Sequence, residues 1–489
     1  MRAEYQGFKT YERTGVVLNV NDTVRVDIPM QVGEVTQNVT VSAEAVKVQT
    51  ESAEVSNVVQ GQQVTQLAIN GRNFMALAAL TPGASSDLPS FNLPIPVGSS
   101  NTISFNGNRV DHNLYSIDGG ENYDRGCGGC VTVMPSMDAI AEFKVQTSNY
   151  NPDVGLGSSA TINMALKSGT EDFHGGAYEF LRNDALDAND FFANKSGTSK
   201  PPLKFNNFGY NIGGPFYIPG KYAKGKTFFF WNEEWRRLRQ GTEIFAPAIP
   251  AAERTGNFSG DLTGVKDANG NDTGAIFVPK PLPGQTLPPG LVPGQPFPGN
   301  VIPQSMVDPN AVILADPNLI LPLPNTSDGK FFSAAPSVPT DVREEIIRVD
   351  QVLTNKVQLM VHYINDSVDE HIPTTEWSGS TYPTVGSEFR NPGKHAVIKL
   401  TWMINPTLLN EFSANYNGNR IYIDPRGNFA KPGGLGSVGD IFSGNELNRI
   451  PSLFFYGPRF GVAYTTAYFP FRNAFDGYQF RDTVNKTRG

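Results

Sequence analysis

PSMDAIAEFKVQTSNYNPDVGLGSSATINMALKSGTEDFHGGAYEFLRNDALDANDFF, residues 135–192, is the stretch of this sequence that decides its fold. Up to Gly169 it predicts the end of a small mixed domain, with a short helix start, a strand over Glu142–Thr147, a glycine-rich turn and a second strand over Ala160–Leu166. A strand rich in glycine and aromatic residues, Gly175–Leu181, then opens a different kind of structure. We therefore expect a domain boundary close to Gly169.

The composition of the whole chain favours a β-rich protein with long loops. Its 489 residues are enough for two or three domains, and only 18 % of them are charged, against roughly 25 % in average soluble domains. Turn formers and aromatics are abundant, with 49 Gly, 37 Pro, 32 Phe and 17 Tyr. The formal net charge of −8 argues against a nucleic-acid partner, because phosphate binding needs a basic face.

The hydropathy of the chain predicts no transmembrane helix, since no run of about 18 apolar residues occurs. Barrel strands give a much weaker hydropathy signal, so the lack of a predicted transmembrane helix does not exclude a membrane protein. The N-terminus, MRAEYQGFKTYERTG, lacks the apolar region of a signal peptide. Either a signal has been removed or the chain begins inside a domain, and we expect the second.

Aromatic strands separated by unequal loops follow residue 171. One face of the segment Val357–Tyr363 carries Val357, Leu359, Val361 and Tyr363, and the other carries Gln358, Met360 and His362. An apolar face toward lipid and a polar face toward a lumen is typical of outer-membrane barrels, whereas a soluble sandwich with one core face is the alternative. We expect about eight such strands: Gly175–Leu181, Phe208–Gly213, Lys226–Arg236, Arg343–Val352, Val357–Asn365, Ala396–Met403, Leu408–Tyr416 and Gly477–Asn485.

Loop lengths give an independent indication of a barrel. The connections Leu353–Lys356 and Ile404–Thr407 are short, and Gly214–Gly225 is intermediate. Long connections alternate with them, as in barrels with short periplasmic turns and longer extracellular loops: Asn183–Lys204, Gln240–Val342 and Asp366–Lys394. The longest is rich in Pro and Gly, and a loop of this size is usually functional or disordered.

Four motifs follow one another in the part of the chain before residue 169. They are Ile69-Asn-Gly-Arg-Asn-Phe74, Asn106-Gly107 followed by Arg109, Ile117-Asp-Gly-Gly120, and MDAIAEFKVQTSNY at 137–150. In combination they closely resemble the plug domain of TonB-dependent outer-membrane receptors, in particular the Oar-like group. Segments of the long loop (Ala251–Gly260, Ile302–Ser305 and Leu321–Asn325) resemble the same group.

The alternating residues of the N-terminal region resemble the C-terminal half of a carboxypeptidase-regulatory-like domain. Val16–Val20, Val24–Ile28 and Val35–Val41 have the period of two that predicts strands of a small sandwich. We therefore expect a mainly β chain of three units: residues 1–45 as part of this β-sandwich, 46–169 as an α+β plug, and 170–489 as an incomplete antiparallel transmembrane β-barrel.

The resemblance implies a location, partners and a mode of action. A receptor of this group lies in the outer membrane of a Gram-negative-type bacterium, in contact with its lipid, and a periplasmic protein of the TonB type pulls on the plug to drive uptake of an extracellular ligand. Val35–Glu44 is the candidate coupling segment, but we favour the alternative that it completes the sandwich. Complete barrels of transporters have about 22 strands, so we expect this chain to be a fragment. The ligand is not identified, and a surface structural or adhesive protein, engaging carbohydrate, is the alternative function.

The resemblance also suggests site residues in the plug. Loops carrying Asn106, Arg109, Asp118, Glu121 and Asp124 are expected to face the ligand. The three carboxylates form an acidic cluster for which a cation site is one interpretation and a solvated loop the favoured one. Arg72 and Arg109 are expected to pair with lumen carboxylates of the barrel wall.

Cys127 and Cys130 are the only cysteines, in a glycine-rich loop, and favour a local disulfide in an oxidising compartment over a redox or zinc site. The five histidines are isolated in the sequence. No HExxH, GxSxG or Walker motif occurs, and Glu233 and Glu234 are adjacent, so they point to opposite faces of a strand. We therefore expect neither an enzyme nor a cofactor.

Overall fold

The structure is a computed structural model. It describes residues 2–14, 20, 26–33, 38–42, 53–86, 102–150, 157–189, 191, 194, 200, 202–219, 222–241, 244–374, 382–435, 444–445, 447–450, 453–455, 462–464 and 470–487. Among these residues, no helix is long and apolar enough to cross a membrane.

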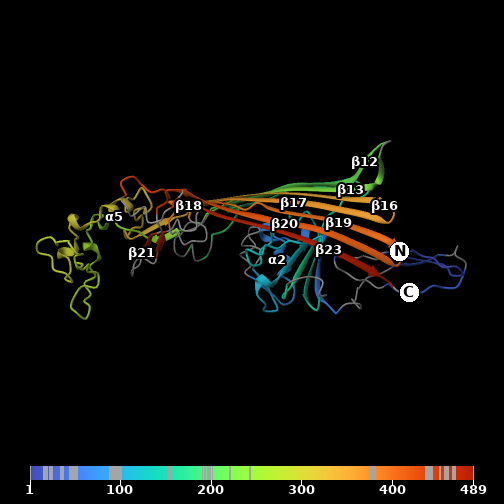
Figure 1. Cartoon of the computed structure of the whole chain (residues 1–489), viewed down its shortest axis with the longest axis horizontal. Helices are drawn as coiled ribbons and strands as arrows, with labels where there is room; N and C mark the ends of the chain where they lie inside the picture. The colour runs from blue at the N-terminus through green and yellow to red at the C-terminus, as the bar shows by residue number, and fades with distance from the viewer. Residues whose placement is uncertain are drawn as a thin grey trace.

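A nine-stranded antiparallel sheet, called the large sheet below, dominates the structure (Figure 1). Its strands are β11 (His174–Asn183), β12 (Leu203–Ile218), β13 (Tyr222–Gly241), β16 (Ser337–Thr354), β17 (Val357–Ile372), β18 (Val385–Arg390), β19 (Gly393–Asn405), β20 (Leu408–Gly427) and β23 (Phe471–Lys486). All eight strands expected from the sequence are present. The extra strand, β18, shares one position of the sheet with β19, since both lie between β17 and β20.

The break between β18 and β19 lies at Asn391 and Pro392. A proline has no N–H to give to a ladder of backbone hydrogen bonds, so it interrupts a strand in the middle of a sheet. Asn391 compensates for the break, because its N–H donates to the Val368 carbonyl (2.9 Å) and its side-chain amide donates to the Arg420 carbonyl (2.8 Å).

The two faces of the large sheet have different surroundings. Inward side chains such as Phe230, Ile346 and Ile364 are fully buried in the core of the domain that precedes the sheet. Outward apolar side chains remain open, with Ile398 48 % and Phe480 72 % exposed. An exposed apolar face of this kind suits hydrocarbon, as the alternation of the sequence predicts.

The apolar outward surface ends at a row of aromatic residues. Cross-strand pairing places Trp231, Tyr363, Tyr416 and Tyr478 in one register row. The next outward residues are charged: the Arg343 guanidinium bridges Glu233 (2.7 Å) and Glu345 (2.6 Å). Beyond Tyr363, β17 continues to Ile372, about 30 Å further at ~3.3 Å per residue, so the strands extend well past the apolar zone.

The connections of the sheet alternate as expected from the sequence. At one end the strands join through short turns, at Lys356 and at Asn405–Leu408, and the chain from Ile218 to Tyr222 is also short. Both termini lie at this end, whereas the long connections lie at the other (Figure 1). The connection expected over Gly214–Gly225 is shorter than the sequence indicated, because β12 continues through Gly214 and Pro215 to Ile218.

The long connection between β13 and β16 is folded rather than extended. It contains β14 (Ile244–Pro247), η6 (Glu253–Thr255), η7 (Ser259–Asp261), η8 (Pro298–Asn300), η9 (Gln304–Met306), α5 (Pro309–Leu314) and β15 (Phe331–Ala334). Arg254 organises it by donating to four backbone carbonyls, those of Ile249, Ala315, Leu321 and Pro322. A small core around Ile320, Leu321 and Tyr382 packs beneath. In the same region lie η5 (Asp184–Leu186) and the pair β21 (Leu453–Phe455) and β22 (Val462–Tyr464).

Residues 55–166 form a compact unit, called the inner domain, on the inward side of the large sheet (Figure 1). Its five-stranded sheet has the order β4-β9-β10-β7-β8, with β4 (Val55–Gln60), β7 (Leu114–Ile117), β8 (Gly120–Glu121), β9 (Ile140–Ser148) and β10 (Thr161–Leu166). The remaining elements are α1 (Gly61–Gln66), η1 (Asn70–Arg72), α2 (Met75–Ala78), β5 (Ala84–Ser86), β6 (Ile103–Phe105) and η3 (Val110–His112). The short helix expected between Pro135 and the strand at Glu142 is wrong: residues 137–139 make a single turn, with the Ala139 N–H on the Ser136 carbonyl (3.0 Å), and Ile140 already begins β9.

The N-terminal region contributes a three-stranded sheet, β1 (Arg2–Ala3), β2 (Thr10–Thr14) and β3 (Asn38–Ser42). β3 pairs with β2 in parallel, so part of Val35–Glu44 completes this sheet, as the favoured alternative held. The strand expected over Val16–Val20 lies almost entirely outside the described residues, and the described part of Val24–Ile28 is not a strand.

Candidate functional site between the inner domain and the large sheet

The inner domain contacts the large sheet through an unusual number of buried polar groups. Inward positions of a strand recur at every second residue, so a strand can present a row of side chains to one partner. On β20 the row is Asn415, Asn417 and Asn419. Their side-chain amides donate, in order, to the Glu121 carbonyl (3.0 Å), the Tyr123 carbonyl (3.0 Å) and the Asp124 carboxylate (2.7 Å).

Glycines allow this close approach. A Cβ at Gly120 would lie 2.5 Å from Val397 Cγ2 and 2.6 Å from Asn415 Oδ1. A Cβ at Gly393, the first residue of β19, would lie 2.0 Å from the Thr132 carbonyl oxygen. Neither distance is compatible with a side chain, so the backbones of the two units meet directly at these points.

Asp118 connects the inner domain to two strands of the large sheet. Its Oδ2 lies 2.7 Å from His362 Nδ1 on β17, and His362 Nε2 lies 2.9 Å from His395 Nδ1 on β19. His395 Nε2 returns to the inner domain, 3.2 Å from the Glu121 carbonyl. On its other side, Asp118 Oδ1 accepts from Arg348 Nη1 (3.3 Å) and from the Leu166 N–H (3.2 Å).

This environment favours the ionised form of Asp118. Burial raises the pKa of its carboxyl, but the hydrogen bond from His362, together with the positive charges of His362 and Arg348, outweighs burial. The pKa of Asp118 therefore lies below its ordinary value. A carboxylate that is buried and still ionised holds its partners firmly in place.

A second group of charged side chains binds the backbone of residues 134–136. Glu234, Glu344 and Asp366 lie opposite one another on β13, β16 and β17, with Arg236 as their cation. The Glu344 and Asp366 carboxylates accept the N–H groups of Ser136 (2.9 Å) and Met134 (3.0 Å), and Arg236 donates to the Met134 carbonyl (3.2 Å). All four charged side chains are at least 98 % buried. As expected from the sequence, Glu233 points the other way, toward Arg343 on the outward face.

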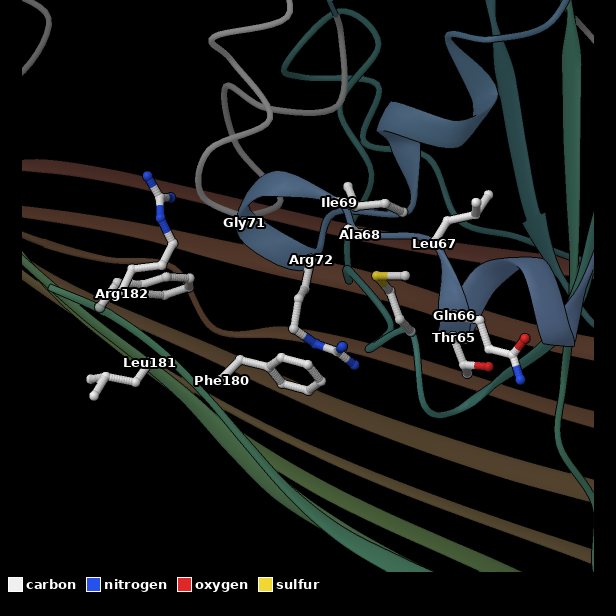
Figure 2. A pocket seen from close by; sticks show the side chains of 12 residues that line it. Thr65, Gln66, Leu67, Ala68, Ile69, Gly71, Arg72, Phe180, Leu181 and Arg182 are labelled. Atoms are coloured by element: carbon white, nitrogen blue, oxygen red, sulfur yellow. The ribbon is translucent and has the colours of Figure 1, made fainter. Parts of the chain in front are cut away.

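A cavity of about 460 Å³ separates the inner domain from β11 and β12 (Figure 2). The Arg72 guanidinium lies over the Phe180 ring, 3.9 Å from its centroid, and pairs with Asp138. Figure 2 shows α1 and η1 on one side of the cavity and Phe180, Leu181 and Arg182 on the other. Burial raises the pKa of Asp138 and lowers that of the nearby Lys167 amine. The contacts of Arg72 with β11 are made with the Tyr178 and Phe180 rings.

The residues that the sequence suggested for ligand contact do not lie together in the structure. Asn106 and Arg109 are exposed, and Glu121 is partly buried and pairs with Arg125 (2.6 Å). Asp118 and Asp124 are buried against the large sheet, so their placement on open ligand-facing loops is wrong, as is the solvated acidic loop. Each has its own partners, Arg348 and His362 for Asp118 and Asn419 for Asp124. Among the described residues, no group of three or more acidic, His or Cys side chains is arranged to hold a metal.

The arginine pairing also differs from the expectation. The carboxylate partner of Arg72 is Asp138 of the inner domain, and its contacts to the large sheet are with the rings of Phe180 and Tyr178. No ion pair of Arg109 occurs among the residues that the structure describes. Cys127 and Cys130 are joined in a disulfide at the end of the loop that follows Asp124.

Two highly connected groups, around His362 and around Arg236, were not predicted from the sequence. The histidines are 33 residues apart and look isolated in the sequence. Their signal is the pairing of β17 with β19, in which Ile364 lies opposite His395, so that His362 and His395 are neighbours on the inward face.

Comparison with known proteins agrees with this architecture. Residues 165–489 match the family described as outer membrane beta barrel domain. The chain is 26 % identical over 251 residues to the TonB-dependent transporter Oar of Myxococcus xanthus, an alignment that covers 47 % of this chain and 21 % of Oar. The chain thus spans about a fifth of the length of this curated relative. Oar is a transporter, in agreement with the expectation that the chain is not an enzyme.

Two solved structures are also similar. The outer membrane transporter YddB from Escherichia coli has 10 % identity and a TM-score of 0.44, with 76 % of this chain and 39 % of that chain covered. The ferric enterobactin receptor PfeA from Pseudomonas aeruginosa has 11 % identity and a TM-score of 0.42, with 80 % and 43 % covered.

Proposed function

The chain belongs to the outer membrane beta barrel domain family, and from this premise we propose that it acts as part of a TonB-dependent receptor that takes up an extracellular ligand. The protein lies in the outer membrane of a Gram-negative-type bacterium. The inner domain is proposed to be the plug, and the large sheet to be part of the wall of the pore. The domain limits 46–169 for the plug and 170–489 for the barrel are part of this proposal.

The observation that carries the proposal is the way in which the inner domain is held. It has its own sheet and an apolar core that, among the described residues, only three side chains of the wall, Phe230, Ile346 and Ile364, enter. Its other contacts with the wall are mainly hydrogen bonds and buried charges. Water can replace each hydrogen bond at a net cost of about 1 kcal/mol, so the polar part of this contact can be released one bond at a time. A domain seated in this way can block a pore and still be moved by an applied force.

The direction of the pull follows from the topology. The N-terminal sheet precedes the plug and lies at the end of the large sheet that has the short turns, which is the periplasmic end of outer-membrane barrels (Figure 1). Among the described residues β3 is an edge strand of that sheet, the kind of element to which a strand of a periplasmic partner can add. A TonB-type energy-coupling protein is the proposed partner.

Removal of the plug tests this function. Deletion of residues 55–166 from the intact gene product should open the pore and make cells sensitive to vancomycin, a hydrophilic antibiotic that outer membranes exclude. A matched deletion of residues 2–42 should leave the pore closed. Equal resistance of both variants, with the barrel present in the membrane at normal level, would contradict the proposal.

Energy dependence separates uptake from adhesion. Compounds depleted from the medium by cells that carry the protein should remain when the coupling protein is deleted. Depletion that persists without the coupling protein would favour a surface structural or adhesive role.

A further inference from the structure

Asp118, His362, His395 and the Glu121 carbonyl form an unbroken hydrogen-bond chain that leaves the inner domain, crosses two strands of the wall and returns to it. The successive distances are 2.7, 2.9 and 3.2 Å. Both imidazoles are fully buried and Asp118 is 9 % exposed, so water does not substitute for a missing link. The hydrogen-bond chain begins and ends within four consecutive residues, 118–121, which comprise a turn and the short strand β8.

The directions of the hydrogen bonds follow from the chemistry of the groups. A carbonyl oxygen only accepts, so His395 Nε2 carries a hydrogen and donates to Glu121. In a neutral imidazole the other nitrogen is then an acceptor, and His362 Nε2–H must donate to His395 Nδ1. The link between His362 Nδ1 and Asp118 Oδ2 therefore requires one further proton, shared between a base and a carboxylate.

This count has two consequences. If a second proton is added, His395 Nδ1–H faces His362 Nε2–H at 2.9 Å, and two donors oppose each other. If the shared proton is lost, the lone pair of His362 Nδ1 faces the Asp118 carboxylate at 2.7 Å, and two acceptors oppose each other. In both states one link of the chain is broken in a buried place.

We propose that Asp118, His362 and His395 form a proton-dependent latch that holds the plug against the barrel wall when it contains one shared proton, and that weakens when a proton is gained or lost. The inference rests on the proposed plug function of the inner domain. The contact between plug and barrel wall is then strongest in a limited range of pH and weaker at lower and at higher pH.

The charged groups around the latch nearly cancel one another, and none of them takes the place of a histidine in the hydrogen-bond chain. Arg348 of β16 faces Asp118 and is shared with Asp350 (2.9 Å). Lys399 of β19 lies beside Gly119 and pairs with Glu411 of β20 (3.7 Å). The Glu121 side chain pairs with Arg125, and Arg481 of β23 lies across from Ser413 of β20. None of these groups bridges the two histidines.

Hydrogen–deuterium exchange of the intact protein in outer-membrane vesicles tests the latch. Protection factors of peptides covering residues 117–124, corrected for the intrinsic pH dependence of exchange, are expected to be highest near neutral pH. They should fall roughly tenfold on the acidic side and again on the alkaline side, which corresponds to the loss of about one hydrogen bond. A protection that is constant from pH 3 to pH 9 would overturn the proposal.

Asp118→Asn makes the test specific. Its side-chain N–H₂ group can donate to His362 Nδ1, so the chain closes without the shared proton. The alkaline fall should disappear in Asp118→Asn, and the acidic fall should remain. If Asp118→Asn keeps both falls, the shared proton is not on the Asp118–His362 link and the proposal fails.

His362→Gln and His371→Gln form a matched pair on one strand. His362→Gln should lower protection at every pH and flatten the profile, whereas His371, which is outward and 40 % exposed, should have no effect when replaced. These measurements need neither a ligand nor a coupling protein. A failed latch therefore leaves the vancomycin and depletion assays of the receptor function unaffected, and a failed receptor function leaves the exchange profile interpretable.

Discussion

Arg236→Met offers the sharpest test of the charged contact at residues 134–136. Arg236 is 99 % buried and is the cation of Glu234, Glu344 and Asp366, to which it is bound at 2.6 Å (Glu234) and 3.7 Å (Glu344). It also donates to the Met134 carbonyl at 3.2 Å. Methionine has a similar length and removes the charge and the donors together, so three buried carboxylates lose their compensating charge.

The magnitude follows from the burial of these groups. Removing one partner of a buried ion pair costs about 3–5 kcal/mol, because the remaining charge is left uncompensated. Proton uptake by the carboxylates limits this cost, so we expect the lower end, about 3 kcal/mol, or roughly a hundredfold in the equilibrium between seated and unseated plug. The carboxylates that hold the Met134 and Ser136 N–H groups would then release them.

The assay is the hydrogen–deuterium exchange of peptides covering residues 132–138 in membrane vesicles. Protection should fall by about two orders of magnitude in Arg236→Met. Arg237→Met is the matched control, since Arg237 is the next residue of β13, is 43 % exposed on the outward face and pairs with Asp341 (3.0 Å). Equal protection in both variants, within a factor of two, would refute the view that the buried charges hold this segment.

Three further changes have defined expectations. Gly120→Val places a side chain where Val397 and Asn415 lie within 2.7 Å, so residues 118–121 should detach from β19 and β20 and cells should become sensitive to vancomycin. Gly176→Val on β11, where no atom lies within 4 Å and the backbone φ is not positive, should leave them resistant. Asn417→Ala removes one hydrogen bond to the inner domain and should lower the protection of residues 121–125 about fivefold, against no change for the outward Asn410→Ala. In the long connection, the N–H groups of Gly274, Thr263 and Gly264 lower the pKa of Asp272 to about 2, so its pKa in the folded state is below its pKa in the unfolded state. The stabilisation of the turn 263–274 should therefore be complete above about pH 4 and be lost as the pH falls through about 2. In exchange measurements, Asp272→Asn should abolish this pH dependence.

The sequence predicted the strands where only one face of the sheet is apolar. Around Val357–Tyr363, outward residues meet hydrocarbon and inward residues meet the inner domain, so the alternation is clear. Beyond Tyr363 the outward residues of β17 are polar, and the inward residues alternate between apolar ones (Ile364, Val368) and acidic ones (Asp366, Glu370). The alternation disappears there, and the upper halves of β13, β16, β17 and β20 were underestimated for this reason.

The contacts of the inner domain were harder to predict, because they depend on register between distant segments. Arg236, Glu344 and Asp366 are more than 20 residues apart in sequence and meet only when three strands are paired in one register. The same holds for His362 and His395. Asp118 was recognised as part of a motif, but its charge suggested a solvated loop, since nothing in its neighbourhood in the sequence shows that Arg348 and His362 cover it.

The lipid exposure of alternate residues on β17 and β19 tests the central claim most directly. Single spin labels at Val361, Ile398, Asn365 and Gln358 would be compared for access to oxygen, which partitions into the bilayer, and to a water-soluble nickel chelate. Labels at Val361 and Ile398 should be accessible to oxygen and shielded from nickel, and a label at Asn365 should be accessible to nickel. Equal access of nickel to Val361 and Asn365 would show that the outward face is not in contact with acyl chains, and the assignment of the large sheet to a membrane-spanning wall would be wrong.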